Sequence, residues 1–222
     1  PDPLLVARAI EENNKKKPET SKINSSKPQI QRTGVIIGAS VLILSHIVMV
    51  GIMTMTPVHM EHHGSGLSAV GLVIGLHIAA MYLPSLITGS LVDKIGRMKM
   101  VIASALTLIA SGLLAAFVPG ESIVWITIAL VLLGLGWNFG LISGTAIVVD
   151  STSVQNRAKI QGSIDVGVAL GGSAGSILSS FIFAYSSYTI LGLVGAYLSF
   201  MLIPIILWIN IKKRNEIKTK VS

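Results

Sequence analysis

The chain has 222 residues, of which 51% are hydrophobic and only 12% are charged, and it contains no cysteine. An average soluble domain carries about 25% charged residues, so the composition excludes a soluble globule and a disordered chain, while the missing cysteines exclude a disulfide framework or a thiolate metal site. An integral membrane protein remains.

Residues 1–33 are polar and contain a run of three lysines, which predicts a cytoplasmic linker. The stretch lacks the apolar core of a signal peptide, so a secretory leader is not expected. It begins with Pro1 rather than Met, and we expect it to continue from a longer chain.

Six runs with at most one charge follow, and a helix needs about 20 mostly apolar residues to cross a bilayer. The expected spans are residues 34–60, 67–92, 100–118, 122–149, 160–185 and 188–211. The fold class is therefore all-α, a polytopic membrane bundle of six transmembrane helices.

The basic residues lie on alternate sides of these spans. All 17 lysines and arginines fall in the linker, in the loops at 93–99 and 150–159, or in the tail at 212–222. Because basic residues collect on the cytoplasmic side of short loops, both ends of the chain are expected there, in a multi-pass protein of the plasma membrane. The net charge of +7 thus indicates topology, and nucleic acid is not an expected partner.

The loop after the second span carries a compact pattern of charge and glycine. Asp93 and Arg97 are four residues apart, so at a helix end they face the same side. We expect Gly89 to let another backbone approach, Asp93 to cap the fifth span, and Arg97 to pair with Asp150. The alternative is that the bases only fix topology. The candidate residues are Gly89, Asp93, Lys94, Gly96, Arg97, Lys99 and Asp150.

This loop resembles the G-x-x-x-D-[RK]-x-G-R-x-[RK] signature of the major facilitator superfamily, where it joins the second and third helices of each six-helix half. The resemblance covers residues 34–211 and implies half of a twelve-helix major facilitator fold. The fourth span lacks the intramembrane arginine, and the fifth the Gly-Pro pair, that are typical of N-terminal halves. The resemblance therefore favours the C-terminal half, with the N-terminal six-helix half as its missing partner; a six-span homodimer is the alternative.

Few polar groups lie inside the spans, and an ionisable group at membrane depth is a functional candidate. His46, His77, Trp137 and Asn138 fall near the middle of their spans and could line a central cavity, where a histidine could carry a coupling proton. The alternative is a neutral histidine bonded to a neighbouring helix. Asp165 is expected one turn into the fifth span, either stabilised by the helix dipole or facing the cavity as a gate or proton acceptor.

Three weaker patterns have structural alternatives. Histidines at 59–63 suggest a metal site, but a Gly-rich loop is a poor cage and none is expected. Met49 and Met53 share a helix face that either lines an apolar cavity or packs as bulk. The fifth span repeats glycine at every fourth position, which favours close helix packing. These glycines are Gly167, Gly171 and Gly175.

No nucleotide-binding loop or catalytic constellation appears, so neither direct use of ATP nor enzymatic activity is expected. The resemblance implies a secondary active transporter that works by alternating access, with proton-coupled antiport driving efflux of a drug-like or partly apolar small molecule. Its expected partners are that substrate, the proton and the lipid bilayer, and it needs no cofactor. Alternatives are a haem-binding electron-transfer protein with His46 and His77 as ligands, and a non-transporting receptor.

Overall fold

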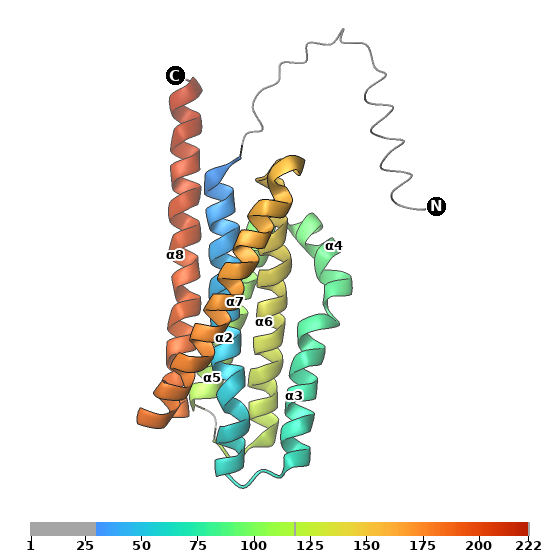
Figure 1. The fold of residues 1–222 in the computed structure, drawn as a ribbon, viewed down its shortest axis with the longest axis vertical. Coiled ribbons are helices and arrows are strands. Elements are labelled where there is room, and N and C mark those ends of the chain that lie inside the picture. Colours follow the sequence, from blue (N-terminus) through green and yellow to red (C-terminus); the bar gives the residue numbers. More distant parts are fainter. Residues whose placement is uncertain (1–29, 118, 222) are drawn as a thin grey trace, which may run out of the picture.

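The computed structural model describes residues 30–117 and 119–221, with side chains as far as Pro204. This part of the chain is all-helical and contains no strand, as the composition predicts (Figure 1). Its helices are α2 (Arg32–His62), α3 (Leu67–Tyr82), α4 (Ser85–Ile95), α5 (Arg97–Phe117), α6 (Ile123–Asp150), α7 (Val154–Tyr185) and α8 (Tyr188–Val221). The expected linker lies almost wholly outside the described residues.

Four helices (α2, α5, α6 and α7) are long and apolar enough to cross a membrane, and α3 and α4 together make a fifth candidate. The described apolar part of α8, Tyr188–Pro204, is shorter than a span. A polytopic membrane bundle is therefore supported, while the count of six spans stays a prediction.

The second expected span is not one straight helix. It is bent by 41° where α3 ends and α4 begins. Pro84 lies at this junction, and because proline has no N–H and its ring crowds the preceding turn, it favours a break in the helix there. The span expected at 67–92 is thus formed by two helices joined at a bend, and its crossing of the membrane as one span stays a prediction.

Other helices extend beyond the expected apolar runs. The helix of the third expected span, α5, starts at Arg97, and that of the fifth, α7, starts at Val154. Helix α8 continues through the expected tail. Gly96 makes the sharp turn between α4 and α5 with φ of +100°, a conformation that favours glycine. The charged loop is thus a one-residue turn between two helices.

Small residues set the closest helix contacts. A Cβ added to Gly112 in α5 would lie 2.7 Å from the Gly192 carbonyl oxygen in α8, and the reverse contact is equally short. On α7, Gly171 and Gly175 lie against Ile47 of α2, which confirms the expected packing role of the repeated glycines. Met49 is buried in the main apolar core, so it packs rather than lining an open cavity.

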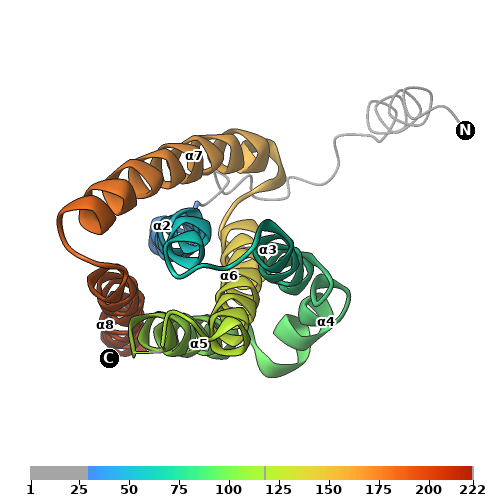
Figure 2. The same cartoon turned by 90° about the horizontal axis from the view of Figure 1, so that it is seen from below.

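Seen along the bundle, α2 lies between α6 and α7, while α5 and α8 lie side by side (Figure 2). The start of α2, the end of α4 and the start of α7 all lie at the same end of the bundle (Figure 1). That end, called the basic end below, carries the loops at 93–99 and 150–159.

Candidate functional site

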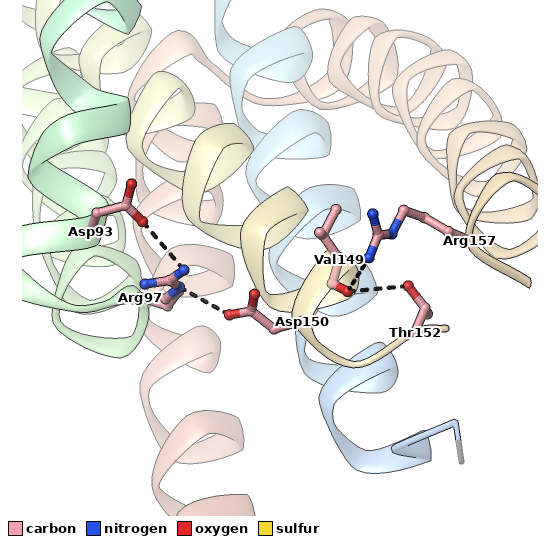
Figure 3. Close-up of polar contacts among 6 residues, drawn as sticks. All are labelled: Asp93, Arg97, Val149, Asp150, Thr152 and Arg157. Carbon is pink, nitrogen blue, oxygen red and sulfur yellow. Dashed lines mark hydrogen bonds and ion pairs between the residues drawn. The ribbon is translucent and has the colours of Figure 1, made fainter. Parts of the chain in front are cut away.

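At the basic end, one arginine joins three helices (Figure 3). The Arg97 Nη2 atom lies 3.2 Å from Asp93 Oδ1 at the end of α4, and its Nε donates to Asp150 Oδ2 at the end of α6, 3.0 Å away. The Asp93 and Asp150 side chains are 71% and 55% exposed. Exposed pairs of this kind contribute about 0.2–1 kcal/mol each, so they bias a conformational equilibrium rather than lock it.

The expected pairing of Arg97 with Asp150 is thus present, but two expected contacts are not. Asp93 pairs with Arg97 and does not cap the fifth span, because α7 begins at Val154 and α4 does not pack on it. No atom of the described chain lies within 4 Å of a Cβ built on Gly89.

The lysines of the loop behave differently from the arginine. Lys94 and Lys99 are exposed and form no ion pair within the described part of the chain. For these two residues, nothing beyond a topogenic charge is visible.

A second arginine, Arg157, binds the end of α6. From the sequence, it was expected only to contribute to the positive charge that sets topology. Arg157 Nη2 donates to the Val149 carbonyl oxygen at 3.3 Å (Figure 3). The Thr152 hydroxyl lies 3.4 Å from the same oxygen and donates at 2.8 Å to the Val148 carbonyl oxygen. Cations near a helix C-terminus are favourable because the last carbonyls carry partial negative charge. The end of α6 therefore ties together α5, through Asp150, and α7, through Val149.

His46 and Trp137 meet inside the bundle. The indole Nε1 of Trp137 donates to His46 Nδ1 at 3.2 Å, and a Cβ on Gly172 would lie 2.7 Å from His46 Nε2. Because an indole N–H only donates, Nδ1 accepts and the neutral ring carries its proton on Nε2. Tyr82, which the sequence did not single out, stacks edge-on against Trp137 at 5.9 Å and is 58% exposed.

His77 and Asn138 do not join that group. Both are fully buried where α3 packs on α6. His77 Nδ1 donates to the Leu130 carbonyl oxygen at 2.7 Å, while its Nε2 has no partner among the described residues. The Asn138 amide bonds to three groups of the bent α3–α4 pair. Of the residues expected to converge, only His46 and Trp137 therefore meet, and Tyr82 joins them.

Asp165 lies eleven residues after the start of α7, not one turn into it, because the helix begins at Val154. The end-of-helix explanation for this carboxylate is therefore wrong. Its side chain is exposed and accepts a hydrogen bond from Gln161 at 3.1 Å.

The histidines near the C-terminal end of α2 pack against aromatic rings. His59 stacks on Tyr188 at 4.1 Å and His62 tilts against Phe183 at 5.7 Å. Within residues 30–117 and 119–221, no group of three or more potential ligands has the geometry of a metal site.

Comparison with known sequences gives the family of this arrangement. Residues 38–221 match the Major Facilitator Superfamily. The chain belongs to the major facilitator superfamily. It is therefore a multi-pass membrane protein of a family of small-molecule carriers, and the haem-protein and receptor alternatives lose their support.

Two of the relatives are named as transporters of the same family. The chain is 57% identical to the uncharacterized MFS-type transporters YdeG and YddS of Bacillus subtilis, over 94% of its own length and 48% of theirs. It is 34% identical to the riboflavin transporter RfnT of Brucella anthropi, over 74% of this chain and 41% of that protein. The chain thus spans about half the length of the curated relatives it matches.

Proposed function

We propose that this chain is the C-terminal six-helix half of a proton-coupled transporter that exports a small, drug-like or partly apolar molecule from the cell. Family membership and the half-length match to the relatives support this reading. The basic end would face the cytoplasm in a plasma-membrane protein, because positive loops stay on that side.

The observation that carries the proposal is the Arg97 junction of α4, α5 and α6. In alternating access, two halves rock around a site near the midplane and expose it to one side at a time. We propose that the Arg97 pairs with Asp93 and Asp150 belong to the outward-open state, in which the basic end is closed. They would break as the basic end opens.

His46 is the better candidate for the coupling proton. A proton on Nδ1 would turn this atom from an acceptor into a donor, so the hydrogen bond from Trp137 would be lost. Proton binding would therefore change a contact between α2 and α6. A second proton on His77 would create a donor at Nε2, which faces no acceptor among the described residues. Asp165, exposed on α7, is the remaining acceptor candidate.

Trp137 and the exposed Tyr82 ring are the substrate-contact candidates, because aromatic faces suit partly apolar molecules. No lysine or arginine occurs between residues 33 and 93 or between 100 and 156, so this half offers an inorganic anion no fixed base there. One relative is named as a riboflavin transporter, which makes riboflavin a reasonable probe alongside the cationic dye ethidium.

The test is transport by the complete protein in proteoliposomes. Ethidium and riboflavin fluorescence are followed while a pH gradient is imposed in either direction and then collapsed with a protonophore. The proposal expects a probe to move against its gradient only while the pH gradient persists. Movement that is equally fast with and without the gradient contradicts proton coupling, whereas dependence on added ATP contradicts secondary transport.

A further inference from the structure

Asn138 of α6 faces the one break in the bent α3–α4 pair. Its Nδ2 donates to the Met81 carbonyl oxygen at 2.8 Å, in the last turn of α3, and to Ser85 Oγ at 2.7 Å, at the first residue of α4. Its Oδ1 accepts at 2.8 Å from the hydroxyl of Thr88, one turn into α4, and this hydroxyl also lies 2.9 Å from the Pro84 carbonyl oxygen. One side chain is thus bonded on both sides of the bend at Pro84.

The bonding capacity of this amide is nearly filled. An asparagine side chain has two N–H donors and two acceptor sites, and three of the four are used by this helix pair. The residue is fully buried. The Asn138 amide therefore has only one acceptor site left with which it could bind a substrate. Loss of a hydrogen bond at such a buried place leaves a polar partner unsatisfied.

The first helix of the bent pair, α3, makes other contacts with α6. His77 bonds to the Leu130 carbonyl, and a Cβ on Gly134 would lie 2.7 Å from the His77 carbonyl oxygen, so the two backbones touch. Loss of Asn138 would therefore leave α3 in place.

The second helix of the bent pair, α4, makes few contacts with other helices. Leu86 and Ile87 are 85% and 69% exposed, and only Thr88 and Val92 of this helix are buried. Among the described residues, its side-chain hydrogen bonds and ion pairs to other helices are those with Asn138 and that of Asp93 with Arg97. Apart from the packing of the buried Val92 and the chain links to α3 and α5, these two polar contacts are what holds α4 and the Asp93 at its end.

We propose that Asn138 is a positioning residue for the transport cycle. It holds α4 at a fixed angle to α3 and so keeps the Asp93 carboxylate within reach of Arg97. It acts through the bend rather than by touching substrate. The inference deepens the proposed function, because the Arg97 junction is taken there as the closed basic end.

The experiment measures the position of α4 directly. Spin labels on cysteines at Ser90 of α4 and Gln155 of α7, both exposed, report the distance between α4 and the start of α7 in the complete transporter. Asn138→Leu removes all three bonds at similar volume, and Thr88→Val removes the donor to Oδ1. Thr107→Val is the matched control, because Thr107 makes the same local bond to the carbonyl four residues earlier but has no partner on another helix.

We expect one narrow distance in the parent and in Thr107→Val, and a second, longer population in Asn138→Leu and Thr88→Val. Folded Thr88→Val protein with the parent distance overturns the proposal, even if Asn138→Leu fails to fold. Because no substrate or gradient is present, this result is independent of whether the protein transports protons. In a transport assay, a positioning role lowers the maximal rate with little change in KM, whereas a raised KM at an unchanged maximal rate would indicate substrate contact instead.

Discussion

The hydrogen bond from Trp137 to His46 is the residue-scale feature most open to a direct test. It fixes the neutral tautomer of the ring and ties α2 to α6. Glutamine at position 46 retains an acceptor for the indole but does not titrate. The His46→Gln variant therefore removes the titrating group while it keeps the contact with Trp137, so an effect on proton coupling can be distinguished from a loss of packing.

His46→Gln is expected to abolish pH-driven accumulation of the transported probe, to the level of protein-free liposomes, while exchange of labelled for unlabelled probe persists. The reason is that exchange needs no net proton movement. His77→Gln serves as the comparison and is expected to retain pH-driven transport if it folds. Full pH-driven transport by His46→Gln would remove this residue from the coupling pathway.

The two arginine contacts at the junction predict a second effect. Lysine at position 97 keeps the charge but loses the planar fork that reaches Asp93 and Asp150 together. With about 1 kcal/mol or less at stake in exposed pairs, Arg97→Lys should lower the initial transport rate by up to about fivefold. Lys94→Gln, at a base of the same loop that forms no ion pair with the described residues, should leave the rate unchanged. Equal losses in both variants would favour a purely topogenic role for the loop.

At the element scale, the contact between α5 and α8 is set by two glycines in backbone contact. Gly112→Ala places a Cβ 2.7 Å from a backbone oxygen that cannot swing away, so the helices must separate. Overpacking of this kind destabilises a protein by about 1–3 kcal/mol. The variant should therefore unfold at a lower temperature, as measured by tryptophan fluorescence in detergent.

Gly75→Ala is the matched control, because no atom of the described chain lies within 4 Å of a Cβ at that helical position. It is expected to leave the unfolding temperature unchanged or slightly raised. An unfolding temperature for Gly112→Ala equal to that of the control would mean that the α5–α8 contact yields easily.

Features that depend on residues close together in the chain were easier to predict from the sequence. The Asp93–Arg97 pair was predictable because the two residues are only four apart in the chain, although Gly96 breaks the helix between them. The link to Asp150 was predictable from charge placed at the same end of the bundle. A break at Pro84 could have been considered from the sequence, because an interior proline weakens a helix, but Pro57 lies inside the continuous α2, so proline alone does not place the bend.

Other features needed the three-dimensional arrangement. The start of α7 was misplaced because charged residues near Arg157 end an apolar run but not a helix, and this error displaced Asp165 from the helix end. The surroundings of Asn138 depend on which helix faces α6 at that depth, and neither hydropathy nor spacing contains that information.

At the scale of the whole molecule, α7 presents an unusual exposed face. Apolar Val166 and Leu170 are exposed on this helix together with Asp165 and Ser173. Charged groups rarely face lipid and usually point into a protein interior or a water-filled cavity. We therefore expect this face to lie against the other half of the transporter or its cavity.

Co-expression of this chain with the N-terminal six-helix half as a separate polypeptide should restore transport that neither part shows alone. The two parts should co-purify, because each would cover the exposed helices of the other. The homodimer alternative predicts instead that this chain alone transports the probe and that its particles contain two copies, as measured by light scattering.

The most direct test of the central claim, a closed basic end held by the Arg97 junction, is the accessibility of that end. A single cysteine at Ser163, exposed in the basic half of α7, is labelled with a maleimide in the complete protein, with and without Asp93→Asn; a cysteine at Glu121, in the opposite loop, is the control. The account predicts faster labelling at position 163 in Asp93→Asn, with altered transport and no change at position 121. Unchanged labelling together with unchanged transport would contradict it.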